Sequence, residues 1–377
     1  MRRLFLVSAS LISCSRALLI PVLYDASNNL HRDIKFHPEQ PARIQCCIDA
    51  IKESDLNTAI KLMDVSDSSE FRFTNDELNH ARACLVEAHS EEYVAGIEAR
   101  CRNSRRKRIE DGKSSLGFLE YVDDDTYMTT ETYDVCLRAT ATWIRCIDHA
   151  LGSSGSAMAL TRPPGHHATS ASINGFCIFN FAAAAAIHAM QLRPDFKVTV
   201  LDWDVHFGQG VSDILKKHER ARYVSIHQTP AFPFMGEKQK VDGMFNNILT
   251  LPIKADVTWS TGYSTVFREH ALPFVLSTEE SSLWVPDLVI VCSGFDALLS
   301  DELASVSLRA EDFGQMTRDL KEHLAVGTKN IPGVVPGVVP GIMLGLEGGY
   351  QLSKDVIGGN LGVAVVETIK GLLGDRM

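Results

Sequence analysis

Five short segments of the chain carry polar, chemically competent side chains directly after an apolar, β-branched run. Open parallel α/β sheets bind their ligands at the carboxyl ends of the strands. We therefore expect the five segments to converge on one pocket. They are RPPGHH at 162–167, DWDVH at 202–206, SIH at 225–227, SGFD at 293–296 and EGGY at 347–350.

The DWDVH segment predicts a metal site. Alternate side chains of an extended strand share a face, so Asp202, Asp204 and His206 point in one direction. Together with Asp296 of SGFD, the residues Asp204 and His206 form a three-ligand set that leaves one position open, as a catalytic zinc requires. Oxygen and imidazole donors suit several divalent metals, so the spacing allows both Zn²⁺ and Fe²⁺. The alternative is a capped turn whose aspartates accept hydrogen bonds from backbone amides.

Two adjacent histidines and a tyrosine supply the remaining chemistry. His166 and His167 follow a rigid Arg-Pro-Pro-Gly turn and are costly to bury without partners. One of them is expected to act as a general base near neutral pH, while Asp202 orients His166 through its ring N–H. Tyr350 follows two glycines and can donate its hydroxyl to a carbonyl oxygen opposite the metal, which would stabilise an oxyanion. The alternative for Tyr350 is a rim aromatic without a role.

The composition favours one large, acidic domain. The chain has 377 residues, of which 45% are hydrophobic, enough for the core of a single α/β enzyme domain. Its formal net charge of −10 argues against direct nucleic-acid binding and fits a basic partner. Nine cysteines without a CxxC pair indicate a reduced compartment, with neither a disulfide framework nor a thiolate zinc site. No segment predicts a membrane span, and the sequence leaves the oligomeric state open.

Residues 1–20 form a separate N-terminal segment. Three arginines and several serines, with no acidic residue before Asp25, are typical of an organellar transit peptide or a secretory signal. The alternative is a frayed N-terminus before the first strand. A transit peptide would place the protein in a plastid or mitochondrion; without one, we expect an intracellular protein of the nucleus or cytoplasm. Residues 21–377 are expected to form the catalytic domain.

Alternating apolar runs and helical periodicity predict an α/β fold, a single domain with a central, mostly parallel β-sheet flanked by helices. Strands are expected at Ile20–Tyr24, Ser156–Leu160, Val198–Leu201, Tyr223–Ile226, Leu288–Val291 and Ile342–Leu346. Helices are expected at Pro41–Ser54, Thr130–Leu151, Phe181–Gln191, Val211–Lys217, Gly262–Leu276, Ala310–His323 and Asp355–Leu372.

Two long stretches, 100–128 and 228–260, are predicted to be loops. The basic segment RCRNSRRKR at 100–108 favours a solvated loop over a localisation or nucleic-acid patch, because the chain as a whole is acidic. The repeat PGVVPGVVPG at 332–341 predicts an extended connector.

The ordered motifs closely resemble those of the zinc-dependent histone deacetylase family, which shares its fold with arginase. Besides RPPGHHA, LDWDVHFGQG, SGFDA and LEGGY, the chain carries HPEQPAR at 37–43, AHSEEYV at 88–94 and GFCIFN at 175–180. The match runs from about Pro21 to Leu373. The tryptophan in DWDVH and the sequence SGFDA resemble the class II branch and its bacterial and plant relatives more than class I.

The resemblance implies hydrolysis of N-ε-acetyl-lysine in histone or non-histone proteins, with release of acetate and a role in chromatin regulation. It implies zinc on Asp204, His206 and Asp296, a tandem pair of His166 and His167 with Asp202 behind His166, and Tyr350 as the group that polarises the carbonyl. It also implies a structural K⁺ site built from oxygens of Asp202, Asp204 and His206 and the carbonyls of Ser225 and Ile226.

The resemblance further implies an acyl-lysine tunnel. Gly175 and Phe176 would line one wall, with the Gly175 carbonyl receiving the substrate amide N–H, and Phe232 or Phe234 would line the other. An aromatic slot about as wide as one methylene chain would enclose the lysine side chain while its acetylated end reaches the metal. The implied surroundings are Arg43 in the inner channel where acetate leaves, Asp124 or Asp125 as a clamp on the substrate backbone, and Leu303 as the gatekeeper at the mouth.

One segment departs from the family pattern. Most relatives follow DWDVH with histidine or tyrosine, then Gly and Asn or Asp, whereas this chain has Phe207, Gly208 and Gln209. The partner of His167 is therefore open, although a longer amide can still accept a hydrogen bond.

Two further functions compete with protein deacetylation. An acetylpolyamine or other small-molecule amide would use the same chemistry, but a glutamate at the gatekeeper would suit a polyamine better than Leu303 does. A catalytically inactive acyl-lysine-binding scaffold would follow from a degenerate second histidine dyad.

Overall fold

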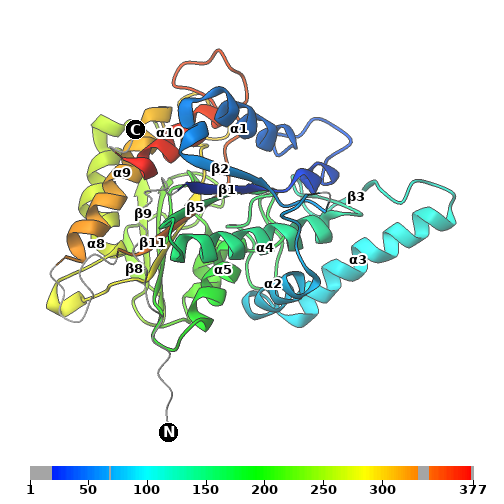
Figure 1. Cartoon of the computed structure of the whole chain (residues 1–377), viewed down its shortest axis with the longest axis horizontal. Helices are drawn as coiled ribbons and strands as arrows, with labels where there is room; N and C mark the ends of the chain where they lie inside the picture. Colours follow the sequence, from blue (N-terminus) through cyan, green and yellow to red (C-terminus); the bar gives the residue numbers. More distant parts are fainter. Residues whose placement is uncertain (1–18, 68, 330–338, 375–377) are drawn as a thin grey trace, which may run out of the picture.

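A nine-stranded sheet runs through the centre of the molecule, between two layers of helices (Figure 1). The computed structural model describes residues 19–67, 69–329 and 339–374. The strand order is β2-β1-β5-β11-β10-β6-β7-β9-β8, and every neighbouring pair is parallel except β8 and β9. This architecture confirms the predicted fold class.

The strands of the sheet are β1 (Ile20–Tyr24), β2 (Ile60–Asp64), β5 (Ser156–Leu160), β6 (Val198–Asp202), β7 (Ala221–Gln228), β8 (Lys240–Asp242), β9 (Ile248–Ile253), β10 (Leu288–Ser293) and β11 (Gly341–Leu346). A separate antiparallel hairpin consists of β3 (Phe118–Tyr121) and β4 (Tyr127–Thr129). The longer helices are α1 (Ala42–Glu53), α2 (Asn75–Ala88), α3 (Glu91–Glu110), α4 (Thr132–Leu151), α5 (Phe181–Gln191), α6 (Gln209–Leu215), α9 (Ala310–Gly327) and α10 (Leu361–Leu373). Short helical turns are η1 (Ala26–Leu30), η2 (Asp55–Thr58) and η5 (Glu280–Ser282), and a continuous run comprises η3 (Trp259–Tyr263), α7 (Ser264–Val266), η4 (Phe267–Ala271) and α8 (Leu272–Val275).

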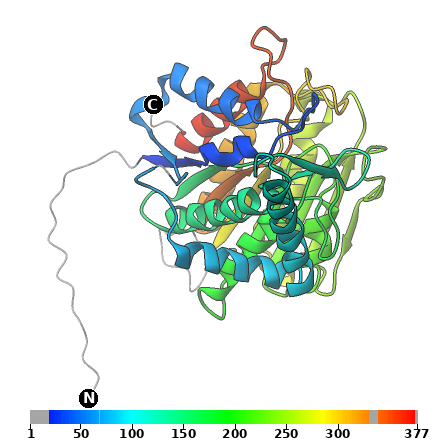
Figure 2. The ribbon, with the colours of Figure 1, turned by 90° about the vertical axis from the view of Figure 1, so that its right-hand side faces the viewer.

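Helices cover the two faces of the sheet (Figures 1 and 2), and each helical layer buries its own hydrophobic core against the sheet. Helices α2 to α6 cover one face, with Trp143 and Phe181 in the core. Helices α1 and α8 to α10 cover the other, with Trp203 and Phe313 in the core. Strands β5, β6, β10 and β11 are buried along their whole length, which explains their uninterrupted apolar sequences.

All six predicted strands are present, but β2 and β9, which lie at or near the edges of the sheet, were not predicted. Strand β2 lies at one edge and exposes part of its sequence, so its apolar run is interrupted. Strand β9 contains Pro252, which normally argues against a strand. Pro252 is tolerated because the pairing with β8 extends only to Thr250.

The predicted loop at 100–128 is wrong: residues up to Glu110 belong to α3, and the β3–β4 hairpin follows. Helix α3 is polar on most of its surface, so it lacks the apolar period that the prediction relied on. Its basic residues form ion pairs, among them Arg102 with Glu98 and Arg105 with Glu131. The stretch is solvated as expected, but it is helical.

Two further predictions change in detail. Helix α10 begins at Leu361 rather than Asp355, because Gly358 and Gly359 adopt positive φ angles of 91° and 88° and Asn360 caps the helix. The predicted loop at 228–260 contains β8 and β9. The N-terminal segment 1–20 and the connector 332–341 lie mostly outside the described residues, so both stay predictions.

Candidate active site

Four of the five predicted segments meet at one cavity of about 190 Å³ beyond the carboxyl ends of the central strands. His166 and His167 follow β5, His206 follows β6, Asp296 follows β10 and Tyr350 follows β11. The remaining lining residues are Asp125, Gly175, Phe176, Phe232 and Leu303.

The SIH segment does not reach this cavity, contrary to prediction. His227 is buried, and its ring nitrogens lie 3.0 Å from the Ser225 hydroxyl and 3.0 Å from the Gly236 carbonyl oxygen. It therefore anchors the loop after β7. Strand β7 lies beyond β6 in the sheet, one position farther from β10 and β11.

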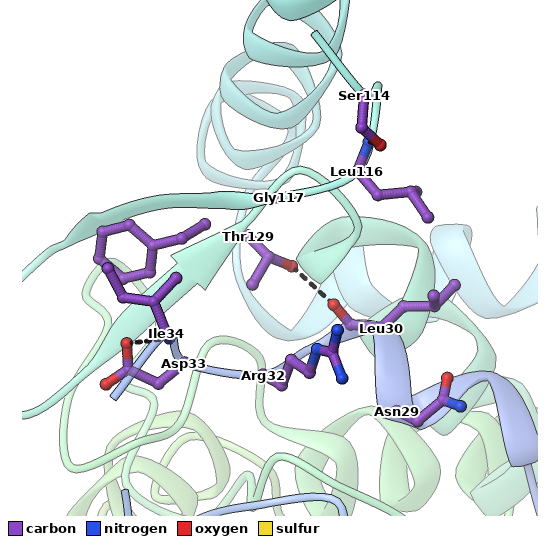
Figure 3. A pocket seen from close by; sticks show the side chains of 10 residues that line it. Asn29, Leu30, Arg32, Asp33, Ile34, Ser114, Leu116, Gly117 and Thr129 are labelled. Atoms are coloured by element: carbon purple, nitrogen blue, oxygen red, sulfur yellow. Dashed lines mark hydrogen bonds between the residues drawn. The ribbon is translucent and has the colours of Figure 1, made fainter. Parts of the chain in front are cut away.

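A larger cavity of about 650 Å³ lies between residues 29–34 and the start of the β3–β4 hairpin (Figure 3). Thr129 donates a 3.3 Å hydrogen bond to the Leu30 carbonyl there, and the Asp33 carboxylate accepts one from its neighbour's backbone. The described residues that line it include Arg32 and Asp33 but no histidine, cysteine or tyrosine. The smaller cavity is therefore the better candidate for chemistry.

The predicted metal ligands form one cluster. Atoms of Asp204, His206 and Asp296 that can bind a metal all lie within 4.8 Å of one another. Nδ1 of His206 lies 3.2 Å from Oδ1 of Asp204 and 3.0 Å from Oδ2 of Asp296. Burial alone would lower the pKa of His206, but the two carboxylates raise it well above its ordinary value. Two buried carboxylates that share one ring nitrogen fit a divalent cation, and the donor set suits zinc or iron.

The first histidine dyad has the predicted partner. His166 Nδ1 lies 3.1 Å from Oδ2 of Asp202, and the same oxygen accepts a 2.8 Å hydrogen bond from the Tyr223 hydroxyl. Burial alone would lower the pKa of His166, but Asp204 and Asp202 raise it to about 10. A side chain at Gly208 would come within 2.5 Å of Asp202 and of Tyr223, so glycine is required for the dyad to close.

Gln209, whose reach the sequence left open, contacts the second histidine. It is the first residue of α6, and its Oε1 lies 2.6 Å from Nδ1 of His167. Burial and the neighbouring His166 lower the pKa of His167 well below its ordinary value. A neutral His167 that donates through Nδ1 has a free lone pair on Nε2, as a general base requires. The pKa values of the two histidines are therefore shifted in opposite directions.

Tyr350 is held in place from three sides. Its backbone N–H donates a 2.7 Å hydrogen bond to Asp301, and its ring packs edge-on against Phe176 at 5.7 Å. The guanidinium of Arg43 lies 4.6 Å from the ring centre and binds the carbonyls of Gly349 and Glu347. Burial raises the pKa of Tyr350, so the phenol keeps its proton. Arg43 is fully buried and does not line the cavity itself, so its assignment to an inner channel stays a prediction.

The aromatic walls lie as the resemblance implies. The Phe232 ring packs edge-on against His167 at 4.9 Å, whereas Phe234 is 71% exposed and does not line the cavity. Gly175 has a φ of 52°, and a side chain there would come within 2.7 Å of both His167 and Phe232. Glycine at this position therefore keeps the tunnel open.

The two candidate rim acids differ in their position relative to the cavity. Asp125 lines the cavity and Asp124 does not. The Asp125 carbonyl accepts a 2.9 Å hydrogen bond from His37, whose ring also packs against Phe176. Leu303 lies at the mouth with 39% of its surface exposed.

Two supporting carboxylates were missed by the sequence analysis. Glu347 accepts hydrogen bonds from the backbone of Gly165 and His166, at 2.6 and 3.1 Å, and burial raises its pKa to about 7. Asp301 accepts from the backbone of Tyr350 and Leu303, and burial raises its pKa to about 6. An acid directly after the apolar strand β11 was a usable signal for Glu347, but nothing in the sequence marks Asp301.

Comparison with known proteins identifies the class that this fold and site define. A model of the histone deacetylase domain matches residues 37–356, and the chain belongs to that family. It is therefore a deacetylase-family amidohydrolase, and the family implies a divalent metal and an acetylated substrate.

Two relatives and one solved structure show how far the similarity extends. An uncharacterized protein of Synechocystis sp. is 32% identical over 94% of this chain and 100% of its own length. The human protein named polyamine deacetylase HDAC10 is 28% identical over 93% of this chain, which spans 47% of that relative. The crystal structure of the HDA15 HD domain superposes with a TM-score of 0.73 at 22% identity, over 95% of this chain and 90% of the other, and supports the fold alone. No helix among the described residues is long and apolar enough to cross a membrane.

Proposed function

We propose that this chain hydrolyses the side-chain amide of N-ε-acetyl-lysine in a protein or peptide, with Zn²⁺ as its metal. The observation that supports the proposal most is the convergence of three groups on one narrow cavity: the Asp204–His206–Asp296 cluster, neutral His167 and the phenol of Tyr350. When bound, the metal would polarise the carbonyl and activate a water molecule.

The side chains can move the protons that hydrolysis requires. As the water oxygen bonds to the carbonyl carbon, its proton passes to Nε2 of His167, whose Nδ1–H is held by Gln209. The Tyr350 hydroxyl donates to the oxyanion that develops. The C–N bond then breaks as His167 returns the proton to the lysine nitrogen, which gives acetic acid and a neutral amine. The acid proton then passes to the amine, which leaves acetate and an ammonium group. His166, bonded to Asp202, tunes the charge beside the reacting atoms.

The cavity suits a lysine side chain better than a polycation. Phe176 and Phe232 can sheath the four methylene groups, and the Gly175 carbonyl can accept the amide N–H. Asp125 is positioned at the rim to accept hydrogen bonds from a substrate backbone. Leu303 places an apolar group at the mouth, where a second amine of a polyamine would be desolvated without a partner. The net charge of −10 fits a basic protein substrate, such as a histone tail.

An acetylpolyamine is the second candidate substrate, because one relative is named a polyamine deacetylase and Asp125 provides one acid in the cavity wall. An inactive acyl-lysine-binding scaffold has less support, because Gln209 bonds to His167 and both dyads are therefore complete. The K⁺ site, a role in chromatin and the location in the cell stay predictions.

Turnover of an acetyl-lysine peptide beside acetylspermidine tests the proposal, with protein prepared metal-free and then loaded with zinc. The expected result is a kcat/KM that favours the peptide, and activity that requires the metal. Leu303→Glu is the matched specificity variant and should shift the ratio toward acetylspermidine. A wild-type preference for acetylspermidine would transfer the assignment to polyamines, and no turnover of either substrate would favour the scaffold.

A further inference from the structure

A second cluster of metal-binding side chains lies between α2 and α5, outside the catalytic cavity. It consists of His80 and Cys84 on α2 and His188 on α5. Their ligand atoms all lie within 4.8 Å of one another. Helices α2 and α5 lie side by side on the face of the sheet that α4 also covers, as Figure 1 shows. We propose that these three residues bind a zinc ion that ties α2 to α5.

The helices place the three ligands by simple geometry. His80 and Cys84 are four residues apart, so they share one face of α2 and project together. The start of α2 is fixed by a capping box between Thr74 and Glu77. Helix α5 is a run of small alanines around His188, which lets α2 approach closely.

The interatomic distances are close to those of a zinc site. Nε2 of His80 lies 3.7 Å from Sγ of Cys84 and 2.8 Å from Nδ1 of His188. In a tetrahedral zinc site with ordinary bond lengths, nitrogen and sulfur ligands are about 3.5 Å apart and two nitrogens about 3.3 Å apart. The distance between His80 and Cys84 therefore fits as it stands, and the rings of His80 and His188 need to separate by only about 0.5 Å.

The other ring nitrogen of His188, Nε2, also supports a metal site. Nε2 is buried without a hydrogen bond, in a side chain only 9% exposed, and it lies 3.8 Å from Oδ1 of Asp148 on α4. Histidines that bind metals usually donate their other ring N–H to a carboxylate. Metal binding through Nδ1 would fix the proton on Nε2, directed at Asp148.

The ligand set suits zinc, since it combines one thiolate with two imidazoles. His80 is exposed, so water can occupy the fourth position. Burial raises the pKa of Cys84 to about 11, so the thiol must release its proton when the metal binds. The absence of a CxxC pair, which argued against a thiolate zinc site, does not bear on this cluster because the cluster takes a single cysteine.

Cobalt titration of the metal-free full-length protein separates this site from the catalytic one. The catalytic cluster contains no sulfur, so a thiolate-to-cobalt charge-transfer band in the near ultraviolet reports only on a cysteine site. The expected result is two equivalents of Co²⁺ per chain in the wild-type protein, one equivalent in Asp204→Ala, and a clear band in both. Cys84→Ser should lose the band and one equivalent, and zinc loading should raise the Tm of wild type more than that of Cys84→Ser.

Two further variants keep the test decisive. His80→Ala removes an exposed ligand, which leaves the core intact, and should weaken cobalt binding at this site at least tenfold. Cys146→Ser is the matched control, since Cys146 is a buried cysteine on α4 outside the cluster, and it should retain the band. No band in saturated wild type, or a band that persists in Cys84→Ser, would overturn the proposal and leave a plain hydrogen bond between His80 and His188.

Discussion

Removal of the Gln209 acceptor gives the sharpest test of the catalytic assignment. In Gln209→Leu the buried Nδ1–H of His167 loses its partner at 2.6 Å. An unsatisfied buried donor costs about 1–3 kcal/mol, which corresponds to a roughly 5- to 150-fold lower kcat if the cost falls on the reactive tautomer. In Gln209→Asn the amide is shorter by one methylene, so water can bridge the gap. The loss is then about one ordinary hydrogen bond, a roughly two- to tenfold effect.

The assay is kcat on an acetyl-lysine peptide, with bound zinc measured for each variant. Metal content should stay at the wild-type level in both Gln209 variants and in His167→Ala, which should have no measurable turnover. Equal rates for Gln209→Leu and wild type would show that the contact does not orient the base. A gain of several orders of magnitude in Gln209→Asn would mean that the natural residue disables the dyad, and the scaffold function would then be preferred.

The other predictions concern the metal, the phenol and its support. Each catalytic ligand can be replaced in turn, as Asp204→Ala, His206→Ala or Asp296→Ala. Each variant should lose the catalytic metal and the activity together, because the two remaining protein ligands hold the ion poorly. Full metal occupancy of that site, measured by mass spectrometry, would refute the ligand assignment. Tyr350→Phe should retain metal and KM but slow turnover by about a hundredfold, the scale of one oxyanion donor, and unchanged kcat would make the phenol a bystander. Asp301→Ala removes the acceptor for the Tyr350 backbone and should lower kcat about tenfold with metal retained; a fall in metal content or in the folded fraction instead would show that Asp301 acts on the fold.

Sequence patterns predicted the interior of the sheet better than its edges. Strands such as β10 are buried on both faces, so their sequence is a continuous apolar run with polar residues at the tip. Strand β2 is partly exposed, β9 contains Pro252, and α3 is polar on most sides, so each lacks the pattern of a buried element. Ion pairs such as Arg105 with Glu131 stabilise α3 in place of an apolar face.

The site residues on strand tips were predictable because chemistry restricts their type. A metal needs Asp and His, and an oxyanion needs a donor, so spacing and residue type suffice to nominate Asp204 or Tyr350. The supporting contacts were not predictable in this way. Gln209 reaches His167 only because α6 begins at that residue, and Asp301 binds backbone N–H groups, which every residue but proline carries. Such contacts depend on the three-dimensional path of the loops, which short sequence patterns do not specify.

The position of β11 constrains how the molecule can be synthesised and folded. This strand is the last one within the described residues, yet it lies between β5 and β10 in the middle of the sheet. Glu347, directly after it, binds Gly165 across 182 residues of sequence, and the Gly349 carbonyl binds Arg43 across 306. Contacts of such range form slowly, and a chain still on the ribosome holds β5 and β10 without the strand that joins them. The segment from Gly341 onward therefore both closes the sheet and completes the cavity, and a shortened chain that ends before β11 would present two open strand edges to its neighbours.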